Sequence, residues 1–172
     1  MDQAAEILVH ALAHSPSAWP KSAAARSEVS LFLENPERLA FAAVTGDELL
    51  GWIGAIRHSQ FVCELHPLAV GPEHQGQGLG RKLVKRLEAA ARDEGICTMW
   101  LGADDDFGGT TLFGVDLYPE VLDHLRNLAP ASGHPYTFYR HMGYTVVGVL
   151  PDADGPGKHD ILMAKRIEAR PD

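Results

Sequence analysis

Apolar residues recur at helical spacing in some stretches of the chain, and they alternate or run continuously in others. Helical spacing is clearest in 79–94, whose apolar stripe consists of Leu79, Leu83, Leu87 and Ala90 or Ala91. Further helices are predicted at 3–13, 21–33 and 118–128, with a short one that opens at 134–139 and ends at Gly143. Strands are predicted at 39–44, 49–56, 61–70, 96–102, 144–150 and 160–167.

The order of these elements indicates the fold class. The runs 39–44 and 49–56 are separated by Thr45-Gly46-Asp47-Glu48, a pattern typical of a β-hairpin. The strand 61–70, the helix 79–94 and the strand 96–102 form a unit that implies a right-handed parallel crossover. We therefore expect a single α/β (α+β) domain over residues 1–172, with antiparallel strands at both ends and a parallel join in the middle.

The segment from Glu64 to Val70 has the most specific strand pattern. Strict alternation predicts that Glu64, His66, Leu68 and Val70 share one strand face. Pro67 cannot donate a ladder hydrogen bond, which predicts a gap in or beside the sheet. Glu64 and His66 are both candidates for a general base. The alternatives are a surface glutamate at a strand edge and a satisfied, partly buried histidine.

The glycines after this strand predict a phosphate-binding loop. The sequence Gln75-Gly76-Gln77-Gly78-Leu79-Gly80 leads directly into the helix 79–94, so the backbone can turn tightly there. Unpaired N–H groups at a helix N-terminus attract anions such as phosphate. A carboxylate beside such a loop suggests group transfer from a phosphate-bearing cofactor.

Composition and charge narrow the possible partners. The 172 residues are 45% hydrophobic and 22% charged, and no apolar run approaches the length of a membrane span. The N-terminus lacks the basic region of an export signal, so we expect a cytoplasmic protein. A net charge of −8 argues against non-specific binding to nucleic acid and is compatible with a cationic ligand. Cys63 and Cys97 are expected to be buried free thiols.

Acidic residues gather after the strand 96–102. Between Leu101 and Leu125 the chain has no Lys or Arg but six acidic residues: Asp104, Asp105, Asp106, Asp116, Glu120 and Asp123. One interpretation is a solvated loop followed by an ordinary helix face. The other is a negative surface that holds a polycation through charge-assisted hydrogen bonds.

Two motifs resemble the GNAT superfamily of N-acetyltransferases. The loop Gln75-x-x-Gly78-x-Gly80 resembles its acetyl-CoA pyrophosphate loop, and Phe138-Tyr139-x-x-x-Gly143-Tyr144 matches its late helix-to-strand segment. More specifically, the segments ELHPLAV, LGADDD and DLYPEV and the Trp19-Pro20 pair resemble aminoglycoside 6'-N-acetyltransferases of the small dimeric type. The similarity extends from Trp19 to Ile167.

The resemblance implies the acyl-CoA N-acyltransferase type of fold. Its central sheet is mixed and mostly antiparallel, splayed in the middle, with helices on both faces. This chain departs from the family at the N-terminus, where the family usually begins with a strand and this sequence predicts a helix.

The resemblance also implies roles for individual residues. Glu64 is expected to be the general base, with His66 as a rival base or a substrate-orienting group. Tyr139 matches the tyrosine that protonates the departing thiolate. The expected cofactor-binding residues are Leu68 and Val70 through their main chains, together with Gln75, Gly76, Gly78, Gly80 and Arg81.

The expected acceptor site consists of acidic and aromatic residues. Asp104 and Asp105 follow the strand next to that of Glu64 in this fold, so we expect them at the rim of the same cleft. Asp116 is a further candidate, and Asp106 is expected to face solvent. Trp19 either covers a sugar ring or is a core anchor.

Three functions remain possible from the sequence. The first is an acetyl-CoA-dependent aminoglycoside 6'-N-acetyltransferase that confers antibiotic resistance, expected from the resemblance to be a homodimer. The second is an N-acetyltransferase of another amine, such as a polyamine or a protein N-terminus. The third is a non-catalytic acyl-CoA-binding sensor. The nine histidines show no zinc-ligand spacing, so no metal is expected.

Overall fold

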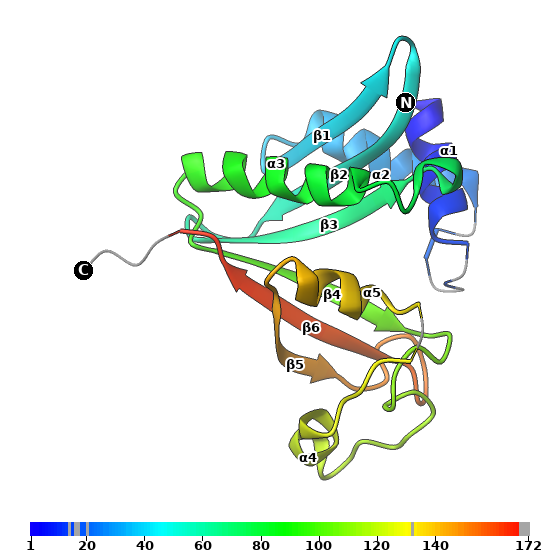
Figure 1. The fold of residues 1–172 in the computed structure, drawn as a ribbon, viewed down its shortest axis with the longest axis vertical. Helices are drawn as coiled ribbons and strands as arrows, with labels where there is room; N and C mark the ends of the chain where they lie inside the picture. Colours follow the sequence, from blue (N-terminus) through cyan, green and yellow to red (C-terminus); the bar gives the residue numbers. More distant parts are fainter. Residues whose placement is uncertain (14, 16–17, 20, 132, 169–172) are drawn as a thin grey trace. The chain divides into compact units, whose positions relative to one another are not determined.

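The computed structural model describes residues 1–13, 15, 18–19, 21–131 and 133–168. Its helices and strands follow the predicted order, and most of their ends lie within two or three residues of the prediction (Figure 1). They are α1 (Asp2–Ala11), α2 (Ser22–Glu34), β1 (Arg38–Thr45), β2 (Glu48–Arg57), β3 (Val62–Val70), the 3₁₀ helix η1 (Pro72–His74), α3 (Leu79–Asp93), β4 (Thr98–Asp105), α4 (Val121–Arg126), α5 (Pro135–His141), β5 (Thr145–Leu150) and β6 (His159–Arg166).

The fold is mixed α/β with a six-stranded, mostly antiparallel sheet, which confirms the predicted fold class. The pairs β1–β2, β2–β3 and β5–β6 are antiparallel. The predicted splay in the middle of the sheet stays a prediction. No helix in the described part of the chain is long and apolar enough to cross a membrane.

The chain divides into two compact units. One contains residues 1–14, 18–99 and 166–172, and the other contains residues 15–17 and 100–165. The first unit holds the β1–β2–β3 strands, α1, α2 and α3; the second holds most of β4, all of β5 and most of β6, with α4 and α5. The expectation of one domain over residues 1–172 stays a prediction.

The first unit is built around a core between α1, α2 and the face of the sheet that carries Trp52 and Ala69. The indole Nε1 of Trp52 donates a hydrogen bond to the Ala4 carbonyl oxygen at 3.1 Å, and its ring packs edge-on against Phe32 at 5.5 Å. α3 packs on β1, β2 and β3 through its apolar stripe, and in Figure 1 it lies in front of these strands with α2 behind them. The buried residues of the core are Ala5, Ile7, Leu8, Ala25, Val29, Phe32, Trp52 and Ala69.

A β-bulge in β3 changes which of its residues share a face. The pairing jumps from Ile53 opposite Leu68 to Ala55 opposite Leu65, so that His66 and Pro67 of β3 lie opposite the single residue Gly54 of β2. A side chain at Gly54 would collide with the Phe32 ring and lie 2.6 Å from the His66 carbonyl oxygen. Glycine at this position therefore lets α2 approach the strands closely.

The prediction of one shared face is right for Glu64 and His66, whose side chains lie 3.9 Å apart, and wrong for Leu68 and Val70 because of this bulge. Glu64 pairs with Ile56, and Ala69 pairs with Trp52. Ile56 and Trp52 both pack into the core beside α1 and α2, and directly paired residues share a face. Glu64 therefore lies on the same face as Ala69, five positions later, which strict alternation forbids.

The two cysteines are free thiols, and only one is buried. Burial raises the pKa of the Cys63 thiol to about 11, so this thiol stays protonated at neutral pH. Cys97 precedes β4, is only half-buried, and donates a hydrogen bond from Sγ to Glu168 Oε2 at 3.0 Å. The prediction that both thiols are buried is therefore wrong for Cys97.

Candidate active site

The glycine-rich loop has the conformation that an anion site requires. Gly76 and Gly78 adopt left-handed φ values of 71° and 79°, and α3 begins at Leu79 with no side-chain cap on its first turn. The first N–H groups of such a helix have no partner within it. Because nothing lies within 4 Å of a Cβ at either glycine, this loop has room for a phosphate group.

Side-chain amides fasten this loop to the strand before it. Gln75 Nε2 donates to the Val70 carbonyl oxygen at 3.0 Å, and Gln77 Nε2 donates to the Glu73 carbonyl oxygen at 2.9 Å. Gly80 and the exposed Arg81 lie in the first turn of α3, where a cation complements bound phosphate. The loop residues predicted to bind the cofactor are thus brought together in one unit.

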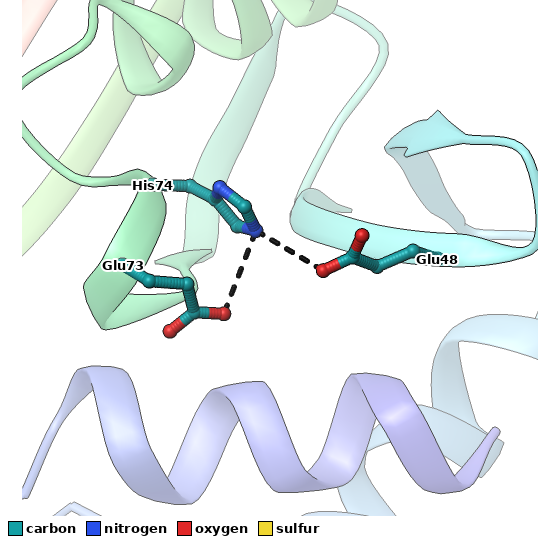
Figure 2. Close-up of side chains that lie close together, drawn as sticks. All are labelled: Glu48, Glu73 and His74. Atoms are coloured by element: carbon teal, nitrogen blue, oxygen red, sulfur yellow. Dashed lines mark hydrogen bonds and ion pairs between the residues drawn. The ribbon is translucent and has the colours of Figure 1, made fainter.

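Three ionisable side chains gather just before the glycine-rich loop. Figure 2 shows His74 between two exposed carboxylates, with Nε2 3.4 Å from Glu48 Oε1 and 3.5 Å from Glu73 Oε1. Their ligand atoms lie within 4.8 Å of one another, so this group could hold a divalent cation. The sequence did not predict this group, because Glu48 lies in β2, far from Glu73 and His74 along the chain. Exposed carboxylates beside a histidine also occur without any metal.

Glu64 is a half-buried carboxylate with a defined partner. Its side chain is 19% exposed, and its Oε2 lies 2.8 Å from Nε2 of His58, in the turn between β2 and β3. Its other oxygen, Oε1, lies 3.9 Å from His66 Nδ1. One oxygen is thus occupied by a histidine at the surface, and the other faces a second histidine.

His66 lies between two carboxylates. Its Nε2 is 3.7 Å from Glu28 Oε1, and that oxygen accepts a hydrogen bond from Arg38 at 2.7 Å. Burial lowers the pKa of His66, the charges of Glu64 and Glu28 act against this by raising it, and Arg38 lowers it. The imidazole is therefore neutral at physiological pH, with two carboxylates placed to stabilise its charged form.

Trp19 packs as a core anchor and also lies beside His66, and its role in covering a sugar ring stays a prediction. It is half-buried and packs against the α1–α2 core, as a core anchor does. Its ring centroid also lies 5.3 Å from that of His66, with the rings tilted by 51°. Trp19 therefore forms an aromatic wall directly beside the candidate base. Pro20, its partner in the resemblance, lies outside the described residues.

The acidic residues of the second unit have three different environments. Asp105 is fully buried, and it accepts hydrogen bonds from Gly109 N and Thr110 Oγ1, both at 2.6 Å, so its carboxylate organises the loop that follows β4. Asp106 is also buried and accepts from Ser15 Oγ at 2.7 Å. The prediction that Asp106 faces solvent is therefore wrong. Asp116 is exposed and accepts from Tyr118 N at 3.1 Å.

Asp104 has the electrostatics of a cation-binding group. Its side chain reaches the surface, but surrounding protein removes much of its water, and this desolvation is the largest cause of its raised pKa. The charges of Asp160, Asp154 and Asp106 act in the same direction, and together these causes raise the pKa to about 7. A bound ammonium would offset this repulsion, which is what the hypothesis of a negative surface requires.

Tyr139 is a buried hydroxyl on α5. Its ring packs edge-on against Phe138 at 5.1 Å and Tyr144 at 5.7 Å. Burial raises the pKa of its phenol, so the group remains a protonated hydrogen-bond donor across the physiological range. The helix that carries it is capped by His134, whose Nδ1 accepts from Tyr136 N at 3.0 Å.

The predicted site residues are thus distributed over both units. Trp19, Glu64, His66 and the cofactor-binding residues belong to the first, while Asp104, Asp105, Asp116 and Tyr139 belong to the second. Sequence reasoning missed the three ionisable groups around Glu64 and His66, namely Glu28, Arg38 and His58. They come from three separate elements, and no local spacing marks them.

A family model and similar solved structures all indicate acetyltransferases. The model of the acetyltransferase (GNAT) family matches residues 5–109. A crystal structure of aminoglycoside 6'-N-acetyltransferase complexed with coenzyme A is 42% identical with a TM-score of 0.89, covering 99% of this chain and 92% of that chain. The aminoglycoside 6'-N-acetyltransferase from Enterococcus faecium is 42% identical with a TM-score of 0.87 and the same coverage.

A sequence relative has a different acceptor in its name. N-alpha-acetyltransferase RimI from Mycobacterium tuberculosis is 32% identical over 91 residues, which are 51% of this chain and 54% of that protein. The chain therefore matches about half the length of this curated relative.

Proposed function

This chain belongs to the acetyltransferase (GNAT) family, and we propose that it is an aminoglycoside 6'-N-acetyltransferase acting as one domain over residues 1–172. Acetyl-CoA supplies an activated acetyl group as a thioester, and the acceptor supplies an amine. The observation that carries the proposal is the half-buried Glu64 on β3, the strand that leads directly into the glycine-rich loop. The 42% identity to two aminoglycoside 6'-N-acetyltransferases over nearly the whole chain supports this acceptor.

The cofactor-binding part of the proposal rests on the backbone. The left-handed Gly76 and Gly78 and the uncapped start of α3 fit a pyrophosphate, and Gln75, Gly80 and Arg81 line the same turn. Main-chain groups of Leu68 and Val70 are proposed to hold the pantetheine arm. No metal is needed for any of these contacts.

The chemical part requires one base and one acid. An ammonium group must lose a proton before its nitrogen can attack the thioester carbonyl, and Glu64 takes that proton. Tyr139 donates its phenolic proton to the departing thiolate. His66 orients the acceptor or acts as the base in place of Glu64. Trp19 covers a sugar ring, while Asp104 and Asp116 attract the ammonium groups, Asp104 most directly. The buried Asp105, predicted at the rim of the cleft, instead holds the loop after β4 through Gly109 and Thr110.

A protein N-terminus is the alternative acceptor. The match to RimI supports a protein N-terminus as an alternative substrate. A panel of kanamycin-type aminoglycosides, spermine-like polyamines and N-terminal peptides, compared by kcat/KM, separates these possibilities. A higher kcat/KM for a peptide or polyamine than for every aminoglycoside would reject the proposed acceptor.

The test of the reaction itself is CoA release. Purified protein with acetyl-CoA and a kanamycin-type substrate should release CoA well above background, and Glu64→Gln should lower the rate about 100-fold, to a residual rate that is still measurable, while keeping CoA affinity. Tight CoA binding without turnover on any amine would instead indicate an acyl-CoA sensor. We further propose a cytoplasmic homodimer that confers antibiotic resistance, to be checked by sedimentation and by aminoglycoside susceptibility of cells that express the chain.

A further inference from the structure

Glu64 offers its two carboxylate oxygens to two different histidines. Oε2 is in hydrogen-bond contact with His58 Nε2 at 2.8 Å, whereas Oε1 lies 3.9 Å from His66 Nδ1. A charge-assisted hydrogen bond at 2.8 Å has good length, and a separation of 3.9 Å is no direct bond. The two oxygens are therefore not equivalent.

We propose that His58 is a positioning residue for the general base: its ring N–H holds Glu64 Oε2, so that Oε1 takes the proton from the acceptor ammonium. This inference rests on the proposed function and adds a residue to it. The proton passes from the ammonium nitrogen to Oε1, and the nitrogen lone pair thus freed attacks the thioester carbonyl. The C–S bond then breaks, its electron pair leaves on the CoA sulfur, which takes the Tyr139 phenolic proton, and the new amide nitrogen gives up its surplus proton, which restores the phenol. His58 itself gains and loses no proton in this step.

Hydrogen bonds hold the backbone of the turn that carries His58. His58 N donates to the Val62 carbonyl oxygen at 3.0 Å, and Ser59 Oγ accepts from the N–H groups of Phe61 and Val62, both at 3.2 Å. Val62 begins β3 two residues before Glu64. The histidine and the carboxylate are thus fixed to the same short piece of backbone, which limits how far either can swing.

An ordinary surface ion pair is the competing explanation. The His58 side chain is 45% exposed, and pairs between exposed groups contribute little to stability. Replacing His58 should therefore leave folding intact, so a test of activity can be separated from an effect on stability. A loss of activity without a loss of stability then reports on positioning.

The experiment uses four variants of the full chain and one control. His58→Leu removes the donor, His58→Gln keeps an amide N–H at similar reach, and Glu64→Gln removes the base. The double variant His58→Leu/Glu64→Gln completes a double-mutant cycle. His10→Leu is the control, because His10 is an exposed histidine on a different element, α1.

We expect His58→Leu to lower kcat about tenfold, with the melting temperature and acetyl-CoA affinity unchanged. His58→Gln should recover most of this loss. In the Glu64→Gln background, His58→Leu should cause no further loss, because the group it positions is already gone. A kcat for His58→Leu within twofold of wild type, or an equal loss in both backgrounds, would overturn the inference.

A second measurement is independent of turnover. The NMR resonances of the His58 ring should change on Glu64→Gln, while those of His10 should not. If the wild-type protein acetylates no amine, the proposed function fails, and this measurement still decides whether the pair exists. Unchanged His58 resonances in Glu64→Gln would reject the pair even in an active enzyme.

Discussion

Glu28 Oε1 lies 3.7 Å from His66 Nε2, so that a side chain of α2 reaches β3 within the candidate site. The same oxygen accepts from Arg38 at 2.7 Å, and both side chains of this ion pair are only 15% exposed. The Arg38 guanidinium in turn lies 4.7 Å over the Phe32 ring. His66 is therefore held beside a nearly buried charge pair whose two members push its pKa in opposite directions.

Glu28→Gln is expected to lower the pKa of His66 further. Burial already holds this pKa below 6.5, and the substitution removes one of the two carboxylates that raise it. NMR titration of the His66 ring measures the change, which we expect to be about half a pH unit or more. Glu34→Gln, an exposed change at the end of the same helix, should leave the titration unaltered. An upward shift in Glu28→Gln would contradict this electrostatic account.

The same lowered pKa predicts a pH dependence of stability. In the unfolded chain His66 titrates near 6.5, whereas the folded chain resists its protonation. The unfolded state therefore binds more protons as the pH falls below about 6.5, and the free energy of unfolding should fall in that window. Replacing His66 with Asn should reduce this dependence in urea titrations at pH 7 and pH 5. The same slope in both proteins would exclude His66 as its source.

Gly78→Ala is expected to weaken both folding and CoA binding. A left-handed conformation costs a non-glycine residue about 1–2 kcal/mol, and no neighbour within 4 Å adds a steric effect. Gly46→Ala is the matched control, since Gly46 in the β1–β2 turn has φ of 55° and equally open surroundings. Both variants should lose similar unfolding free energy in urea, but only Gly78→Ala should lose CoA affinity by calorimetry. Equal affinities would argue that the cofactor does not use this loop.

The elements and the loop could be predicted because their signals are local. The stripe of α3 and the glycines before it are properties of one continuous segment, and both are confirmed. The assignment of Leu68 to the face of Glu64 failed because β3 has an extra residue where His66 and Pro67 both lie opposite Gly54. Strict alternation assumed an unbroken strand, although the interruption predicted at Pro67 marks the same place.

The ionisable neighbours of the base were missed for a related reason. Glu28, Arg38 and His58 come from α2, β1 and a turn, and only the packing of these elements brings them to β3. The prediction for Asp106 failed because Ser15, 91 residues earlier, supplies a buried donor to its carboxylate. In each case the deciding partner is remote in sequence.

Asp104→Asn is expected to stabilise the free protein at alkaline pH. The folded-state pKa of about 7 lies above the ordinary value of 3.8, so the ionised form is disfavoured in the folded chain. The destabilisation therefore grows as the pH rises from about 4 to about 7 and is complete above it. The variant should melt at a higher temperature than wild type at pH 8, with a smaller difference at pH 4. Asp116→Asn, at an exposed position, should change neither value, and a lower melting temperature for Asp104→Asn at pH 8 would contradict the repulsion.

Tyr139→Phe separates proton donation from packing. The ring contacts with Phe138 and Tyr144 survive the change, and only a hydroxyl is lost, so the unfolding free energy should change by about 1 kcal/mol or less. Because burial keeps this phenol protonated, its loss removes a donor at every pH in the working range. General acid catalysis contributes about 10²–10⁴ in rate, so kcat should fall by about 100-fold or more in steady-state assays of CoA release.

Tyr144→Phe is the control for this last prediction, because it alters a neighbouring buried hydroxyl 5.7 Å away between ring centroids. It should retain wild-type kcat. If Tyr139→Phe also retained wild-type kcat at pH 7, the departing thiolate would have to take its proton from water. In that case the raised pKa of Tyr139 would reflect burial in the core of its unit, without a role in the reaction.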